Sequence, residues 1–127
     1  MKKIRVLFCR YTVDGHDRGL LTTMSRCKDA GMEVIYIHFF DVKEIARAAV
    51  QEDVDVIGIT TSMGQHFFIL EELLALLKKD DCNIPVIMGG VIPTVDVPRL
   101  KETGAKGVFG PGSSPDDAVK LISELSE

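Results

Sequence analysis

The stretch VDVIGITT, residues 54–61, decides the fold of this sequence. Its valines and isoleucines do not alternate strictly with polar residues, which is typical of a strand buried on both faces. The same kind of composition occurs in four other short runs: IRVLFC (4–9), EVIYIHF (33–39), PVIMGG (85–90) and GVFG (107–110). Five such runs indicate a parallel sheet covered by helices on both sides.

A helical pattern follows each of these runs. Gly31 is placed to end the first helix in a left-handed turn, and Asp41 with Glu44 forms the D-x-x-E pattern of a capping box. We expect helices over about residues 17–30, after a cap at Asp41, over FILEELLALLKK (68–79), over DVPRLKETG (96–104) entered at Asp96, and after a cap at Ser114 in SPDD (114–117).

Alternating strands and helices predict an α/β fold of the doubly wound, flavodoxin-like or Rossmann-like kind, with five parallel strands in the order 2-1-3-4-5. The length of 127 residues suits a single domain, residues 1–127. In such sheets ligands bind beyond the carboxyl ends of the strands, where the strand order reverses between the first and the third strand.

The composition excludes several classes of partner. The net charge is −4 and the basic residues are scattered, which argues against nucleic-acid binding. The apolar stretch near the N-terminus is interrupted at Arg10, too early for a signal peptide or a membrane span, so we expect a cytoplasmic protein that does not bind membranes. Three cysteines without a C-x-x-C pair (Cys9, Cys27 and Cys82) are typical of reduced, buried thiols.

Small residues follow three of the strands at the carboxyl edge. Each glycine taken alone is explained by a tight turn, but together they indicate a slot for a long, flat ligand. The residues concerned are Thr60, Thr61, Ser62 and Gly64 after the third strand, Gly89 and Gly90 after the fourth, and Gly110, Gly112 and Ser113 after the fifth.

The usual ligands of such folds do not suit this edge. The sequence contains no G-x-x-x-x-G-K-[ST], and no G-x-G-x-x-G follows the first strand. The loop after that strand lacks the glycines and hydroxyls of a flavin phosphate site. A phospho-receiver would have an aspartate at the end of the third strand, where this chain has threonine.

The segment VDGHDRG, residues 13–19, contains a candidate metal ligand. His16 can give one ring nitrogen to a metal while Asp14 orients the ring through the other nitrogen. Gly15 permits a sharp bend between them, and Gly19 removes side-chain bulk where the helix begins. A single histidine cannot build a zinc site, so the metal must bring its own equatorial ligands, as in a macrocycle. The alternative is a turn histidine with a local hydrogen bond. We interpret His38 and His66 as structural.

With Asp14, His16 and Gly19 the chain contains D-x-H-x-x-G, within the fuller string DGHDRG. It also contains EDVDVIGIT (52–60), GGVIP (89–93) and FGPG (109–112). On these motifs the sequence resembles the cobalamin-binding domain of adenosylcobalamin-dependent acyl-CoA mutases, the methylmalonyl-CoA mutase family, over almost its whole length.

The resemblance implies that adenosylcobalamin binds with its dimethylbenzimidazole tail away from cobalt and in the slot. His16 would be the lower axial ligand of cobalt, and Asp14 would hydrogen-bond its ring, which makes these two the catalytic residues. The implied cofactor-binding residues are Asp14, Gly15, His16, Asp17, Arg18, Gly19, Thr60, Ser62, Gly89, Gly90, Val91, Phe109, Gly110 and Gly112.

The implied function is that of a small isomerase subunit, inactive alone, which supplies the cofactor for a radical carbon-skeleton rearrangement. A large barrel subunit would hold the acyl-CoA substrate. Three alternatives stay open: a corrinoid carrier for methyl transfer, a glutamate mutase small subunit, and an interaction module that has lost the cofactor. The chain departs from the family pattern at Arg10, where lysine is common, at Thr60-Thr61-Ser62 in place of S-x-L, and in MGQHFF (63–68).

Overall fold

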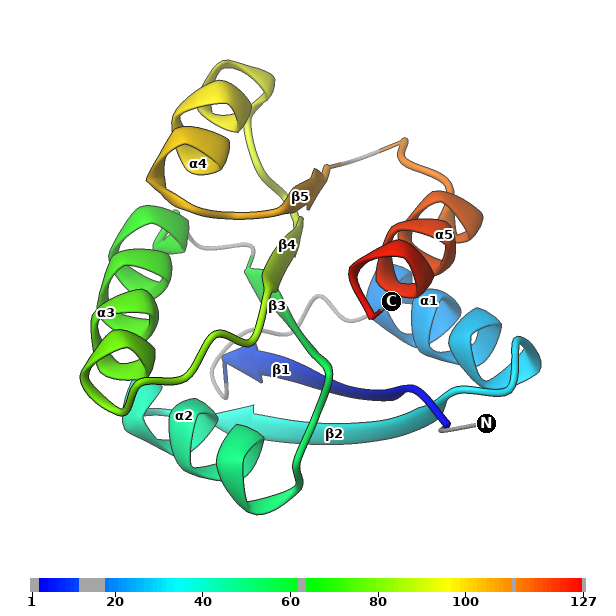
Figure 1. The fold of residues 1–127 in the computed structure, drawn as a ribbon. Helices are drawn as coiled ribbons and strands as arrows, with labels where there is room; N and C mark the ends of the chain where they lie inside the picture. The colour runs from blue at the N-terminus through cyan, green and yellow to red at the C-terminus, as the bar shows by residue number, and fades with distance from the viewer. Residues whose placement is uncertain (1–2, 12–17, 62–63, 111, 127) are drawn as a thin grey trace.

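The structure is a computed structural model that describes residues 3–11, 18–61, 64–110 and 112–126. Strands and helices alternate along these ranges (Figure 1). The strands are β1 (Arg5–Tyr11), β2 (Glu33–Phe39), β3 (Val56–Thr61), β4 (Val86–Gly90) and β5 (Gly107–Phe109). The helices are α1 (Arg18–Asp29), α2 (Val42–Gln51), α3 (His66–Lys79), the 3₁₀ turn η1 (Thr94–Asp96), α4 (Val97–Thr103) and α5 (Pro115–Leu125).

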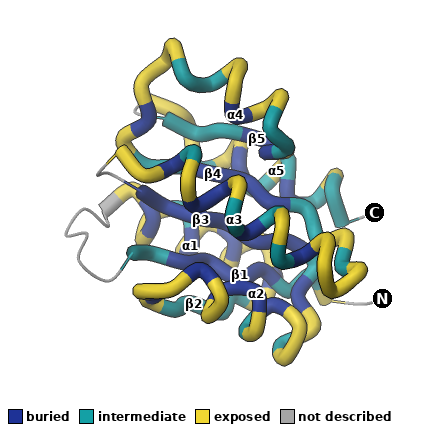
Figure 2. The backbone as a smooth tube through the Cα atoms, turned by 90° about the vertical axis from the view of Figure 1, so that its left-hand side faces the viewer, coloured by how far each residue is buried: buried dark blue, intermediate teal, exposed yellow. Residues whose placement is uncertain are grey.

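The five strands form one parallel sheet in the order β2-β1-β3-β4-β5, which confirms the predicted topology. Helices α2, α3 and α4 cover one face, and α1 and α5 cover the other (Figure 1). β3 lies at the centre of the sheet, and all six of its residues are buried, as its apolar composition predicted. The buried strands lie between helices whose outer turns are exposed (Figure 2).

Two apolar clusters fill the spaces on either side of the sheet. The cluster under α2, α3 and α4 contains residues such as Ile57, Ile59 and Leu73. The cluster under α1 and α5 contains Val6, Phe8, Val56 and Ile87 among others. Successive residues of a strand point to opposite faces, so even-numbered residues of β3 face α1 and α5. Only side chains that point to the face covered by α1 and α5 can therefore reach a ligand bound on that face.

Most of the predicted helix ends are confirmed. Asp41 caps α2 in a complete capping box with Glu44, and Ser114 Oγ accepts a hydrogen bond from the backbone N–H of Asp116. Gly31 follows α1 with a φ of +87°. Helix α3 begins at His66, two residues before the predicted start. Asp96 immediately precedes α4, as predicted, but its side chain makes no capping hydrogen bond, and its carboxylate contacts His66 instead.

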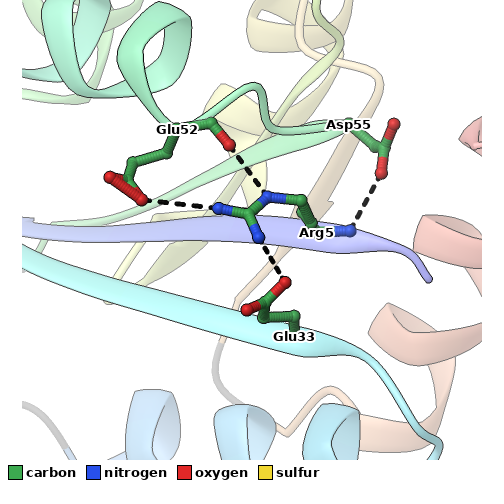
Figure 3. A network of polar contacts seen from close by, with 4 residues as sticks. All are labelled: Arg5, Glu33, Glu52 and Asp55. Carbon is green, nitrogen blue, oxygen red and sulfur yellow. Dashed lines mark hydrogen bonds and ion pairs between the residues drawn. The ribbon is translucent and has the colours of Figure 1, made fainter.

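A polar network joins three segments at the amino edge of the sheet (Figure 3). Arg5 Nε donates to the backbone carbonyl of Glu52 at 2.8 Å, and the guanidinium forms ion pairs with Glu33 and Glu52. The backbone N–H of Arg5 donates to the carboxylate of Asp55 at 2.9 Å. These contacts tie β1 to β2 and to the α2–β3 connection, at the opposite end of the sheet from the carboxyl edge.

The three cysteines are free thiols, and Cys9 and Cys27 are buried while Cys82 is partly exposed. Burial raises the pKa of the Cys27 thiol to about 11, and it raises the pKa of Cys9 further. Across the described ranges, no helix is both long and apolar enough to cross a lipid bilayer.

Candidate functional site

A cavity of about 670 Å³ opens at the carboxyl edge of the sheet, on the face covered by α1 and α5. Its base is formed by β3, β4 and β5, and its sides by α1 and by the start of α5. The residues that line it are Phe8, Gly19, Leu20, Thr22, Thr23, Gly58, Ile59, Thr60, Ile87, Met88, Gly89, Gly90, Val91, Phe109, Gly110, Gly112, Ser113, Ser114, Pro115 and Ala118. This cavity is the slot that the small residues predicted.

The outer part of the base is a row of neighbouring residues on three strands. Thr60 lies opposite Gly89, and Gly89 lies opposite Phe109 in the parallel register. A Cβ added at Gly89 would lie 3.2 Å from the Phe109 carbonyl oxygen, which is tighter than ordinary contact. Glycine therefore leaves the middle of this row flat, with a hydroxyl on one side and an aromatic ring on the other.

At the mouth of the slot, the backbone of β4 lies very close to the backbone of β3. Gly90 has a φ of +109°, and a Cβ there would lie 2.1 Å from the Thr61 carbonyl oxygen. The same oxygen accepts a hydrogen bond from the Val91 N–H at 2.9 Å. Only glycine fits at position 90, because any side chain would collide with the backbone of β3.

The sides of the slot carry hydroxyl groups, and the space next to Gly19 is open. Thr22 and Thr23 come from α1, and Ser113 and Ser114 come from the start of α5. Thr23 Oγ1 donates to the Gly19 carbonyl oxygen at 3.0 Å. A Cβ at Gly19 would have no atom within 4 Å, so a ligand can approach the first turn of α1 closely.

The structure brings most of the predicted binding residues that it describes to this slot. Gly19, Thr60, Gly89, Gly90, Val91, Phe109, Gly110 and Gly112 all line it. Arg18 is the first residue of α1. Asp14, Gly15, His16, Asp17 and Ser62 lie outside the described residues, so their roles stay predictions.

Thr61 does not belong to the slot, although the sequence grouped it with Thr60. Its hydroxyl is buried on the other face of β3 and has no hydrogen-bond partner. Strand parity explains this result, because the side chains of Thr60 and Thr61 point to opposite faces of the sheet.

Several residues that line the slot lie outside the predicted set, among them Phe8, Leu20, Thr22, Thr23, Gly58, Ile59, Ile87 and Met88. Gly58 and Ile87 each lie two positions before a predicted slot residue on the same strand, and this spacing was the signal that could have found them.

The two histidines interpreted as structural both have polar partners. His66 is buried, and its Nε2 lies 2.9 Å from Asp96 Oδ2. His38 Nε2 lies 3.2 Å from Arg10 Nη2 and 3.1 Å from the Tyr36 hydroxyl. Arg10 is the next-to-last residue of β1, and its contact with His38 joins β1 to β2.

The chemistry of the slot suits a flat, largely neutral ligand. Backbone groups, hydroxyls and apolar side chains surround it, and among the residues that the structure describes, the side chains that line it carry no formal charge. Within the described part of the chain, no three His, Cys, Asp or Glu side chains gather as a metal site would require. A metal held by protein ligands alone therefore finds no site among these residues.

Comparison with known proteins gives a family match over most of the chain. The B12 binding domain family matches residues 4–120. The pivalyl-CoA mutase small subunit of Xanthobacter autotrophicus is 33% identical over 127 residues, which cover 99% of this chain and 86% of that protein. The 2-hydroxyisobutanoyl-CoA mutase small subunit of Aquincola tertiaricarbonis is 33% identical, with 96% of this chain and 91% of that protein covered.

Longer relatives contain a similar region as one part. The methylmalonyl-CoA mutase of Escherichia coli is 36% identical over 126 residues, which cover 98% of this chain but 18% of that protein. Among solved structures, a cobalamin-binding protein from Desulfitobacterium hafniense DCB-2 matches with a TM-score of 0.81 at 20% identity, and this chain covers 60% of that one. A Francisella response regulator receiver domain matches with a TM-score of 0.70 at 20% identity, so the fold alone does not separate these functions.

Proposed function

The chain belongs to the B12-binding domain family, and on that premise we propose that it is the cobalamin-binding small subunit of an adenosylcobalamin-dependent acyl-CoA mutase. One observation carries the proposal. The alignments span most of the length of two mutase small subunits, 86% of one and 91% of the other. The cavity supports the proposal, because several of the residues predicted to bind the cofactor line it.

In this proposal the slot binds the dimethylbenzimidazole tail. The flat row of Thr60, Gly89 and Phe109 lets the ring lie close to the sheet, and the Thr60 hydroxyl offers a hydrogen bond to a ring nitrogen. Gly90 and Val91 form one side of the mouth, and Gly110 and Gly112 form the other. Backbone approach of this kind is what glycine permits.

His16 is proposed as the cobalt ligand and Asp14 as the acceptor for its second ring nitrogen. In the sequence both residues come between the carboxyl end of β1 and the start of α1, and α1 forms one side of the slot. Gly15, Asp17, Arg18 and Gly19 would place the loop against the corrin ring. A carboxylate partner fixes the imidazole tautomer and makes the ring a better donor.

The cofactor would supply radical chemistry for a 1,2-rearrangement of an acyl-CoA, and the protein would supply position and shielding. Substrate contacts are assigned to a large barrel subunit. Apolar side chains are exposed around the carboxyl edge at Phe40, Phe68, Val91 and Val95, with exposed fractions from 52% to 85%. Such a rim suits a partner surface over the bound cofactor.

The test is a titration of the purified protein with adenosylcobalamin, followed by the visible spectrum. We expect the form in which histidine replaces the benzimidazole on cobalt, with saturable binding. His16→Ala should bind without that spectral change. A wild-type protein that leaves the spectrum of the free cofactor unaltered would contradict the proposal and favour an interaction module.

A further inference from the structure

The inner end of the slot is formed by a second row of residues. It lies two residues nearer the amino ends of the strands than the row of Thr60, Gly89 and Phe109. In the register of the sheet, Phe8 lies opposite Gly58, Gly58 opposite Ile87, and Ile87 opposite Gly107. The next row toward the amino edge contains Val6 and Val56, which are fully buried and do not line the slot. The row of Phe8 is therefore the last one that a ligand can touch.

Phe8 lies across Gly58. A Cβ added at Gly58 would be 2.8 Å from both Cδ1 and Cε1 of the Phe8 ring, a distance that real Cβ atoms do not show. The ring is 3% exposed and packs in the cluster that contains Val6, Val56 and Ile87. The absence of a side chain at Gly58 thus allows the ring to pack against this residue and to line the inner end of the slot.

The rest of the row is also apolar. A Cβ at Gly107 would be 2.3 Å from Leu121 Cδ2, so a leucine of α5 covers that glycine as Phe8 covers Gly58. Ile87 lies between the two glycines and is 3% exposed. By residue type this wall has neither a side-chain donor nor an acceptor, whereas the hydroxyls of Thr60, Ser113 and Ser114 lie nearer the mouth.

We propose that Phe8, seated on Gly58, is a specificity residue that ends the slot and selects a dimethylbenzimidazole tail over a purine tail. The inference rests on the proposed function, because it takes the slot as the tail site. Methyl groups at the far edge of a benzimidazole can contact Phe8 and Ile87, which line the inner end of the slot. The exocyclic amine of adenine would lose its water there and find no acceptor among these side chains, which weakens binding by about ten- to a hundredfold.

The experiment measures dissociation constants for three adenosylated corrinoids: cobalamin, its adenine-tailed counterpart, and cobinamide, which has no tail base. For the wild type we expect cobalamin to bind about ten- to a hundredfold more tightly than the adenine-tailed form. Gly58→Ala should push the Phe8 ring into the slot and weaken both tailed forms about tenfold or more, without changing cobinamide binding. Phe8→Leu/Gly58→Ala should restore tailed binding, because leucine leaves room for the new methyl group.

Phe8→Leu alone should reduce the preference for cobalamin over the adenine-tailed form. Its matched control is Phe39→Leu, the same change at a buried phenylalanine of β2 in the cluster on the other face. Phe39→Leu removes a similar amount of apolar packing, but it should keep the wild-type preference for cobalamin over the adenine-tailed form.

The outcomes separate this inference from the proposed function. A wild type that binds none of the three corrinoids contradicts the proposed function. Corrinoid binding with equal affinity for both tails, or a Phe8→Leu variant with an unchanged preference, overturns the role of Phe8. If Gly58→Ala does not fold, the comparison of Phe8→Leu with Phe39→Leu decides the question.

Discussion

His66 Nε2 lies 2.9 Å from Asp96 Oδ2, and the two residues come from different connections at the carboxyl edge of the sheet. His66 is the first residue of α3, after β3, whereas Asp96 ends the turn η1, after β4. The histidine side chain is 4% exposed and its Nδ1 has no hydrogen-bond partner. The pair therefore joins the two connections on the face opposite the slot.

Asp96→Ala should lower the free energy of unfolding by about 1–3 kcal/mol, because it leaves the buried Nε2 of His66 without a partner. Asp96→Asn keeps an acceptor oxygen and should retain most of the stability. Urea unfolding of the three proteins measures the difference. Equal midpoints for wild type and Asp96→Ala would show that the contact contributes nothing.

Gly90→Ala should both destabilise the protein and weaken corrinoid binding. The control is Gly31→Ala, which has a similar positive φ but no atom within 4 Å of the new Cβ. The control should lose about 1–2 kcal/mol from its backbone conformation alone. Gly90→Ala should lose a further 1–3 kcal/mol or so, because the Thr61 carbonyl must move away.

Corrinoid titrations complete the comparison of these two glycines. Gly90→Ala should lower the affinity for the corrinoid about tenfold, because β3 and β4 must move apart at the mouth of the slot. Gly31→Ala should bind the corrinoid as the wild type does. If the two variants bind alike, the close approach at position 90 matters for folding only.

These glycines also show how far the sequence could predict the site. Thr60, Gly89 and Phe109 lie in the last two residues of strands whose apolar composition predicted them, so their convergence at one edge of the sheet was predictable. Phe8 and Gly58 lie inside strands, and their contact depends on the register of β1 against β3, which composition does not reveal. The position of Asp96 at the entry to α4 was predicted, but the partner of its carboxylate, His66, lies 30 residues away, beyond the reach of any local pattern.

Alkylation should distinguish the three thiols of the folded protein. The thiolate is the reactive form, and with a pKa of about 11 only about one Cys27 thiol in a thousand is ionised at pH 8. Cys9 is buried and its pKa is raised further. Treatment with iodoacetamide should therefore give one adduct, on Cys82, by mass spectrometry, and three adducts after unfolding in guanidinium.

The same pKa shifts predict a stability that falls in alkali. Above about pH 8.5, the usual thiol pKa, the unfolded chain releases these protons while the folded chain retains them. Stability is therefore full below that pH and is lost as the pH rises toward the folded-state pKa of about 11 for Cys27. In the alkylation experiment described for the folded protein, rapid modification of Cys9 or Cys27 at pH 8 would contradict the prediction. It would mean that the structure around these thiols opens frequently.

Phe68 and Val95 are exposed at 67% and 85%, on α3 and on the turn after β4, and both lie at the carboxyl edge where the proposed large subunit would cover the cofactor. Burying such side chains in an interface removes apolar area from water, and truncation of an interface residue commonly costs about 1–2 kcal/mol or more. Phe68→Ser and Val95→Ser should therefore weaken association with the large subunit about tenfold each, measured by calorimetry with the cofactor present. Val50→Ser is the matched control, since Val50 is 56% exposed but lies near the end of α2, away from this edge. Equal weakening by all three variants, or by Val50→Ser alone, would place the partner surface elsewhere on the molecule.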